Sequence, residues 1–495
     1  MSAQPETKRP RLPLVEPLES RFGSTSKDPK LINAYAEKDE LGLYKVVKRQ
    51  GVSTSFTIPS MPAGPLTPLG QYVATAAIGT IIKLVTFFAS SGTNSSYAYI
   101  EGTGAPIALG VPFVGEQPFT GAIQYNPGSS GLDGERIFGI VGGQFFTLDV
   151  ALSVLTPVVS PAGSNAPTVG LVVLDATTYF MAVDGIIWGS NLNDPTTWNG
   201  LNNIPAQAVP GVGVALARNH SYIVALKTNS TELLYDANNP VGSPLLAYPN
   251  SAFQWGCIDG NTVQDVEDRL FWLAQSKQSS AFVATFAAGQ HERISTPGVE
   301  RLLDDVTGPY NSFSFKDSGH LFYGLTAIGS NITLVYDIGQ NIWYLWTDAK
   351  GNYWPWMSIV AKPDSTILAQ STIGTNANQI FAIDEEFVTD ADGLGNKLVV
   401  PVDIYTANYD AGTRRKKTLM RMDFIADQQP ALLSVRYTED DFKSFSQFRE
   451  VDLNTKRPTL TNCGTFRRRG YHFRYKAPYQ FRIEAVELDL LHGGA

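Results

Sequence analysis

Side chains with reactive or metal-binding chemistry are scarce in this chain. Cysteine occurs only twice, at Cys257 and Cys463, which lie too far apart to outline a disulfide framework and so favour synthesis in a reducing compartment. The five histidines never pair at metal-binding spacing, and the motifs H-E-x-x-H, C-x-x-C and G-x-S-x-G do not occur. We therefore expect no catalytic residue, no metal site and no cofactor, which is to say a protein that is not an enzyme.

Long apolar runs are also missing. The stretch closest to a membrane span, residues 72–90, has Lys83 near its middle, whereas a spanning helix needs about 20 mainly apolar residues without a central charge. The β-branched and aromatic residues at 80–88 instead predict a buried strand that pairs with 97–100, either as a first propeller blade or as its edge. The first ten residues are polar, so we expect neither a secretory signal nor a membrane span.

The chain is rich in residues that favour turns and strands. It contains 44 Gly, 30 Pro, 26 Phe, 21 Tyr and 8 Trp. Asp184-Gly185 separates two apolar runs and predicts a β-hairpin with a type I′ turn. Similar hairpins have turn centres near 142, 229, 277, 330 and 375, so the six centres are 42, 45, 48, 53 and 45 residues apart. A repeat of roughly 40–50 residues is typical of four-stranded propeller blades, and a β-sandwich would not require such even spacing.

Composition and periodicity divide the chain into four parts. We predict a flexible N-terminal arm at 1–20, short strands at 21–65, a β-propeller at 66–388, and a smaller, β-sandwich-like domain at 396–495. The last part contains runs at 471–475 and 480–488 that alternate with period two, as half-buried antiparallel strands do. The predicted fold class is therefore all-β, a propeller with a second β-domain.

Charge is distributed unevenly between these parts. Residues 51–410 contain 12 basic and 29 acidic side chains, whereas residues 411–495 contain 16 and 10. The candidate docking and assembly surface consists of two basic clusters, namely Arg414, Arg415, Lys416 and Lys417, and Arg467, Arg468 and Arg469. Arginine binds carboxylates in bidentate geometry, which suits an acidic protein partner. Nucleic acid binding, supported by the aromatic residues after the second cluster, and a merely solvated face remain open.

The aromatic run from Trp343 to Trp356 offers the alternative function. Exposed indole rings stack on sugars, so this run could serve a carbohydrate-binding or carbohydrate-cleaving propeller. Propeller blades also pack through large aromatic side chains, and core packing is the preferred interpretation.

Several segments resemble the tail nozzle, or packaged-DNA stabilisation, proteins of short-tailed bacteriophages. The segments are 31–37, 193–198, 293–300, 320–323 and 333–337, and the match covers nearly the whole chain after about residue 20, in order. The resemblance implies a six-bladed propeller and a homo-hexameric ring around an axial DNA channel. It also implies a platform built from both termini, so that the strands at 21–65 join the domain at 396–495. The Pro/Ala-rich segments 104–131 and 155–169 depart from the family pattern, and we expect them to be loops that constrict the channel.

The same resemblance implies the partners and the location. Portal and adaptor proteins are expected above the ring, and distal tail proteins such as a fibre, spike or needle below it. Duplex DNA is expected to pass through without sequence-specific binding. The protein is expected in the virion tail, after synthesis in the host bacterial cytoplasm.

Overall fold

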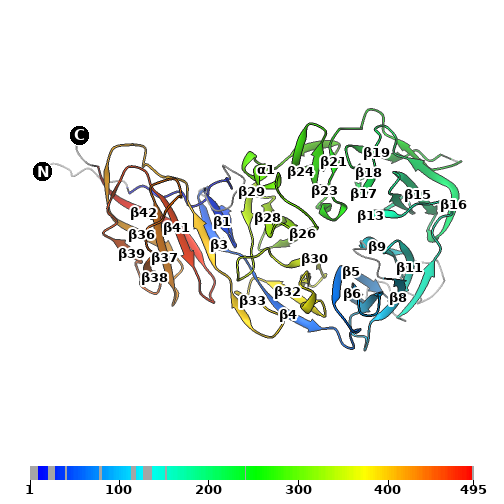
Figure 1. Cartoon of the computed structure of the whole chain (residues 1–495), viewed down its shortest axis with the longest axis horizontal. Coiled ribbons are helices and arrows are strands. Elements are labelled where there is room, and N and C mark those ends of the chain that lie inside the picture. The colour runs from blue at the N-terminus through cyan, green and yellow to red at the C-terminus, as the bar shows by residue number, and fades with distance from the viewer. Residues whose placement is uncertain are drawn as a thin grey trace.

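The computed structural model describes residues 9–19, 28–38, 42–76, 81–112, 119–125, 136–150, 153–239 and 241–492. Almost all regular structure in these ranges is β-strand, and their one α-helix is α1 (Pro297–Leu303). A ring of blades and a separate β-sandwich lie side by side in Figure 1. Within the described ranges, no helix has the length and apolar character needed to cross a membrane. The all-β propeller fold predicted from the sequence is confirmed.

The first four blades follow one another along the chain as four-stranded antiparallel units. Their strands are β5 (Leu66–Ala76), β6 (Ile81–Ser90), β7 (Ser95–Ile100) and β8 (Ile107–Pro112); β9 (Phe119–Tyr125), β10 (Arg136–Val141), β11 (Gln144–Asp149) and β12 (Val154–Val158); β13 (Pro167–Leu174), β14 (Thr177–Ala182), β15 (Ile186–Asn191) and β16 (Asp194–Pro205); and β17 (Gly213–Asn219), β18 (Tyr222–Lys227), β19 (Thr231–Asp236) and β20 (Leu245–Ala247).

Three further blades complete the ring (Figure 1). Their strands are β21 (Gly256–Cys257), β22 (Gln264–Val266), β23 (Arg269–Ser276), β24 (Ser279–Ala287) and β25 (Gln290–Arg293); β26 (Tyr310–Asp317), β27 (His320–Ala327), β28 (Ile332–Asp337) and β29 (Ile342–Leu345); and β30 (Trp356–Ala361), β31 (Ile367–Ser371), β32 (Gln379–Asp384) and β4 (Gly51–Thr57). The last blade is completed by β4, which precedes the first blade in sequence and pairs antiparallel with β32.

The described residues therefore form seven blades, and the implied count of six is wrong. The six hairpin turns found in the sequence belong to blades two to seven. Residues 66–112 add a complete first blade, which the sequence had indicated only as a blade or its edge.

Two local predictions also need correction. At Asp184-Gly185 the hairpin is present, but only Gly185 has a positive φ, of 80°, so the turn is not type I′. The segments 104–131 and 155–169 are not continuous long loops where the structure describes them. In 104–131, β8 and β9 occupy most of the described residues, and in 155–169, β12 and β13 occupy both ends and leave only 159–166 between them. Residues 113–118 and 126–131 lie outside the described ranges.

Aromatic packing between blades explains one motif of the sequence. Trp198 lies in the outer strand of blade three, after the turn at Asn193, which has a φ of 58°. Its ring centroid lies 6.2 Å from that of Phe138, 5.9 Å from that of Phe145 and 5.4 Å from that of Phe180. The indole therefore fills the space between blades two and three, where neighbouring blades bury their faces.

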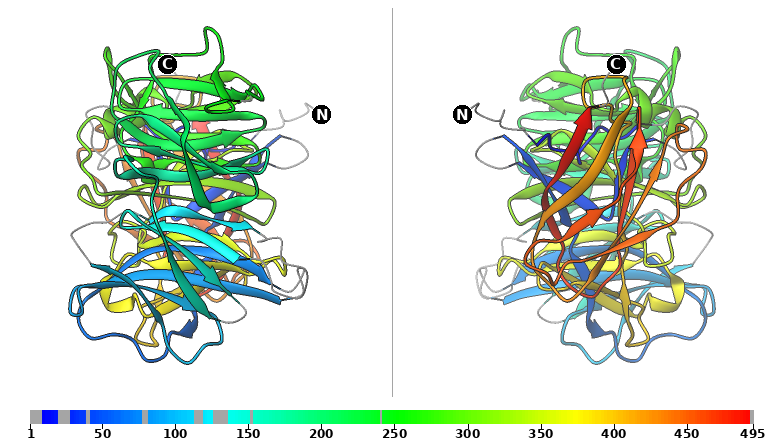
Figure 2. Two further views of the ribbon diagram at one scale, coloured as in Figure 1. Left: turned by 90° about the vertical axis from the view of Figure 1, so that its right-hand side faces the viewer. Right: turned by 90° about the vertical axis from the view of Figure 1, so that its left-hand side faces the viewer.

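The platform consists of two packed sheets, shown from its own side in the right panel of Figure 2. One contains β1 (Lys30–Ile32), β35 (Val402–Tyr405), β41 (Gly470–Tyr475), β37 (Leu432–Thr438) and β38 (Arg449–Asp452). The other contains β2 (Ala34–Lys38), β3 (Tyr44–Lys48), β42 (Arg482–His492), β36 (Lys417–Ala426), β39 (Thr459–Thr461) and β40 (Thr465–Phe466). Phe424 and Phe473 meet between the sheets with ring centroids 6.0 Å apart.

The N-terminal segments are distributed between the two bodies. Of the predicted flexible arm 1–20, residues 1–8 and 20 lie outside the described ranges, but the remainder is anchored, which corrects the prediction. Leu12 and Leu14 are buried in the platform core, and Leu18 is buried against the propeller near α1. Strands β1 to β3 join the platform, whereas β4, also within the segment assigned to the platform, belongs to the propeller.

One continuous sheet crosses from the propeller to the platform. Strand β1 pairs parallel with β29 of blade six and antiparallel with β35 of the platform, which produces a nine-stranded sheet. The hairpin of β33 (Thr389–Ala391) and β34 (Lys397–Val399) extends the sheet of the last blade, because β33 pairs parallel with β4, and the chain then continues into β35 of the platform. The two bodies are thus joined by strand pairing as well as by side-chain packing.

A buried ion pair holds this junction. The guanidinium group of Arg49 donates to both carboxylate oxygens of Asp390, at 3.1 and 2.6 Å, and the two side chains are 1% and 2% exposed. Its remaining N–H groups donate to Asn33 Oδ1 at 3.0 Å, to the Gln50 carbonyl oxygen at 2.8 Å and to the Thr347 carbonyl oxygen at 2.8 Å. The group is therefore fully hydrogen-bonded, as a buried charge must be.

We expect Arg49→Met to lower the unfolding free energy of the unit that contains it by about 3–5 kcal/mol, because Asp390 would be left as an uncompensated buried charge. Lys316→Met is the control, since Lys316 pairs with Glu267 at 3.1 Å on the surface, and it should cost less than about 1 kcal/mol. Chemical denaturation of both variants measures the difference. Equal midpoints would show that the Arg49 pair does not stabilise the junction.

Candidate docking surface

The fold brings the two basic clusters of the sequence together. Lys417 pairs with Phe466 where β36 meets β40, so the residues before β36 and after β40 lie at one edge of the platform. A guanidinium N–H of Arg467 donates to the Arg414 carbonyl oxygen at 3.4 Å. Five of the seven side chains are exposed there, namely Arg414, Arg415, Lys416, Arg467 and Arg468.

The other two side chains are in the interior, which corrects their assignment to a docking surface. Lys417 is 1% exposed, and its ammonium group donates to the carbonyl oxygens of Thr413 and Arg467, at 2.8 and 2.7 Å. Burial lowers the pKa of Lys417, and Asp410 partly opposes that effect. Lys417 thus connects the backbones of the two clusters and presents the neighbouring cations to solvent.

Arg469 has the same positioning role. It is 2% exposed, pairs with Glu439, and donates to the Cys463 carbonyl oxygen at 2.6 Å. Its guanidinium carbon lies 3.9 Å from the ring centroid of Tyr437, a distance typical of a cation–π contact. Both buried cations are satisfied by the platform itself and are not available to a partner.

Most of the exposed cations are not in ion pairs with described residues. Arg468 forms an ion pair with Asp441 at 2.6 Å. Among the described residues, Arg414, Arg415, Lys416 and Arg467 have no ion-pair partner. Four unpaired cations on adjacent segments form a positive surface suited to carboxylates or phosphates.

A buried histidine lies in the platform near the junction. His472 is fully buried on β41, its Nε2 lies 2.6 Å from Asp403 Oδ1, and Arg436 Nε donates to its Nδ1 at 2.8 Å. Nδ1 therefore accepts and Nε2 carries the proton, which is the neutral tautomer. Arg474 Nε also donates to Asp403 Oδ1, at 2.7 Å.

These contacts shift both pKa values. Burial lowers the pKa of His472, and the hydrogen bond to Asp403 offsets this only in part. Burial alone would raise the pKa of Asp403, but the hydrogen bonds from His472 and Arg474 outweigh it and hold that pKa below its usual value. Sequence analysis missed this cluster of charged side chains around His472 because its members come from three separate strands, β35, β37 and β41. The only signal in the sequence was the alternating pattern of β41.

The remaining candidates from the sequence are structural. His320, at the start of β27, is 7% exposed, and its Nδ1 lies 2.6 Å from Asp337 Oδ2, so its ring is paired within the fold. Trp343, Trp346, Trp354 and Trp356 are 3%, 1%, 1% and 4% exposed, so they cannot form a sugar-stacking platform. The carbohydrate alternative thereby loses its proposed site. Within the described residues, no group of three or more His, Cys, Asp or Glu side chains is placed to hold a metal ion.

Part of the propeller matches a family of phage proteins. Residues 170–353 match the family model described as bacteriophage P22 Gp10, β-propeller, and this range spans blades three to six. The match confirms the resemblance to the phage stabilisation proteins within residues 170–353 and supports a structural role in a phage tail. A search of curated proteins found no match to the chain.

Solved structures give weaker likenesses. The chain is similar to the N-terminal domain of Nup159, with 9% identity and a TM-score of 0.39 over 72% of this chain and 99% of that chain. It is also similar to BamB from Moraxella catarrhalis, with 12% identity and a TM-score of 0.36 over 68% and 97%. YCF48 from Cyanidioschyzon merolae gives 10% identity and a TM-score of 0.41 over 68% and 100%. TM-scores of this size do not establish a common fold.

We expect the platform to lose stability as the pH falls below about 6.5, because unfolded chains protonate histidine there while buried His472 resists protonation. The low pKa of Asp403 adds a second loss at still lower pH, below the usual carboxylate range. Between about pH 7 and pH 5, the melting temperature should therefore depend less on pH for His472→Gln than for the unmodified protein. Exposed His220 provides the control, and His220→Gln should keep the original pH dependence. Identical profiles for His472→Gln and the unmodified protein would contradict this assignment.

Proposed function

We propose that the chain is a tail nozzle subunit, which assembles into a ring, closes the portal channel, retains packaged DNA and conducts it during ejection. The observation that supports this proposal is the phage family match across blades three to six. The sequence contains none of the catalytic motifs H-E-x-x-H, C-x-x-C and G-x-S-x-G. This fits the same proposal, since retention and conduction require shape and stability and no bond-making step.

The junction between the bodies suits a component that bears load. Packaged DNA would press on a closed channel. The propeller and the platform of each subunit would therefore have to keep a fixed orientation relative to one another. The nine-stranded sheet and the buried Arg49–Asp390 pair fasten them at neighbouring points. A buried, bidentate ion pair opposes separation because each charge would lose its partner.

The exposed basic edge of the platform is the proposed assembly surface. The platform-bearing residues 411–495 have six more basic than acidic side chains, whereas residues 51–410 have 17 more acidic than basic ones. Such opposite charges favour contact between the platform of one copy and an acidic surface on a neighbour or on a portal or adaptor protein. We propose a homo-hexamer, with distal tail proteins on the opposite side.

The acidity of the propeller suits a conduit. Each lysine or arginine that neutralises a phosphate increases affinity for DNA, so an acidic or neutral lumen would let the duplex slide. Retention would then depend on a steric constriction. Of the segment 155–169, only residues 159–166 lie between strands, and Val159 in that connection is 84% exposed. We propose that this connection, which leads from β12 to β13, faces the lumen of the assembled hexamer.

We expect the triple variant Arg414→Glu, Arg415→Glu and Arg467→Glu to fold normally but to lose ring formation or attachment to DNA-filled heads, because it reverses the charge of the docking surface. Native mass spectrometry and incorporation into particles measure the two losses. The matched control is Lys443→Glu, Lys456→Glu and Arg457→Glu, which reverses three exposed platform cations elsewhere. If the first variant assembles into infectious particles as well as the control does, this surface has no assembly role.

We also expect replacement of residues 160–165 by two glycines to increase DNA leakage from filled particles, since the variant removes the proposed constriction. Shortening the platform connection at residues 454–457, which lies between β38 and β39, is the control and should not leak. The conduit proposal fails if the first variant retains DNA and purified protein binds duplex DNA tightly with a steep dependence on salt.

A further inference from the structure

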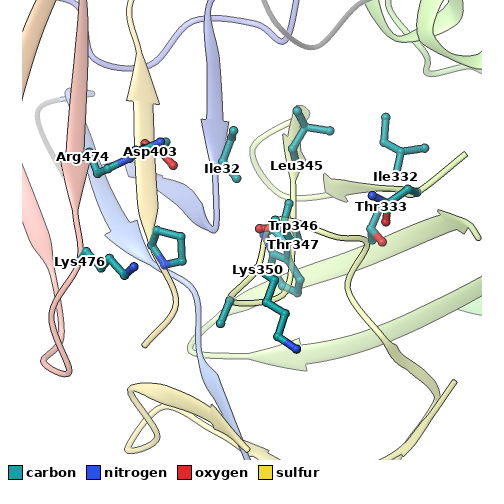
Figure 3. Close-up of a pocket in the computed structure, with 14 residues that line it drawn as sticks. Ile32, Ile332, Thr333, Leu345, Trp346, Thr347, Lys350, Asp403, Arg474 and Lys476 are labelled. Atoms are coloured by element: carbon teal, nitrogen blue, oxygen red, sulfur yellow. The ribbon is translucent and has the colours of Figure 1, made fainter. Parts of the chain in front are cut away.

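A cleft of about 350 Å³ lies between the propeller and the platform (Figure 3). One wall comes from blade six and the segment after it, with Leu345, Thr347 and Lys350. The other wall comes from β35 and β41, with Asp403, Arg474 and the following Lys476. The cleft thus combines residues from two bodies that are far apart in sequence.

The short length of β1 creates the cleft. Strand β1 contains only three residues and contacts β29 at a single pair, Ile32 with Leu345, so the nine-stranded sheet opens beyond Ile32. Asn33 then turns the chain away with a φ of 56°. Its Nδ2 donates to Thr347 Oγ1 at 2.8 Å and to the Pro401 carbonyl oxygen at 3.0 Å, and so joins the walls at one end.

The cleft has an excess of positive charge. Lys350 and Lys476 are exposed, on opposite walls, and among the described residues neither has an ion-pair or hydrogen-bond partner for its ammonium group. Arg474 and Asp403 form an ion pair at 2.7 Å, so they largely neutralise one another. The two lysines are therefore free to receive carboxylates from a ligand that spans both bodies.

Apolar side chains lie beside these lysines. Ile32 and Ile332 are half-buried, and Leu345 is 4% exposed, so apolar surface lines the cleft next to its positive rim. A ligand that fills the cleft binds most tightly if it places an apolar group against these residues and an acidic group against each lysine.

We propose that this cleft binds an acidic peptide segment of a partner protein, in which leucine-like and carboxylate side chains alternate. Extended peptides suit the site because their successive side chains point to opposite sides, so that alternate residues can contact the apolar surface inside the cleft and the lysines at its rim. A nucleic acid backbone satisfies the lysines equally but offers no aliphatic group to the isoleucines, which favours the peptide. The proposal concerns the isolated chain and does not depend on ring formation or DNA retention.

The test uses a fluorescently labelled peptide of three Leu-Glu repeats and the purified full-length protein. We expect saturable binding that weakens about tenfold or more in the double variant Lys350→Glu and Lys476→Glu, because two attractions become repulsions. The matched control, Lys277→Glu and Lys443→Glu, reverses one exposed lysine on each body outside the cleft and should bind within about twofold of the unmodified protein. A peptide of Leu-Gln repeats should not bind.

A second measurement locates the peptide without changing any lysine. Both native cysteines are buried, so maleimide should modify Ala349→Cys, at the cleft, selectively. Bound Leu-Glu peptide should slow this modification, and a single-stranded oligonucleotide should not. The proposal is overturned if the unmodified protein does not bind the Leu-Glu peptide, if the cleft double variant binds it as well as the control does, or if the oligonucleotide protects the cysteine and the peptide does not.

Discussion

The buried pair of Arg49 and Asp390 is the interaction on which the arrangement of the whole chain depends. Arg49 lies between β3, the last N-terminal strand of the platform, and β4, which closes the propeller. Its guanidinium group also bonds to Asn33 and to the backbone at Thr347, so it joins the platform entry, blade six and the segment after the last blade. Since a buried charge is tolerated only while its partners remain in place, the relation between the two bodies is fixed at this point.

Closure of the ring imposes a related constraint on folding. The last blade is complete only when residues 51–57 pair with 379–384, so the two ends of the propeller must meet across more than three hundred residues. Pairing over such separation costs loop-closure entropy and is slow. The platform reduces the freedom of both ends, because β3 and β35 lie on either side of the closure in sequence and are both held in its sheets. Folding of the propeller is therefore coupled to folding of the platform.

The local elements were predictable from the sequence, whereas their connections were not. Hairpins at turn centres such as 142 and 330 follow from short-range apolar patterns, and each has the expected strands. The blade count was wrong because the family pattern was preferred over the additional strands at 66–112. Leu12 and Leu14 lie in a segment predicted to be a flexible arm, although both are buried in the platform core. Residues 1–20 contain four prolines, and proline is tolerated beside an edge strand. The contact of Arg49 with Asp390 spans 341 residues and has no local signal.

Runs of charge in the sequence were an imperfect guide to functional surfaces. Two members of the basic clusters, Lys417 and Arg469, are buried and hold the backbones that present the other five. The cleft lysines, in contrast, are isolated in sequence, 126 residues apart, and become neighbours only because the nine-stranded sheet aligns two bodies. A ligand that bridges them gains both contacts only while that alignment is maintained. The same strand pairing and ion pair that stabilise the junction therefore also preorganise the cleft, since a hinged junction would have to lose freedom on binding.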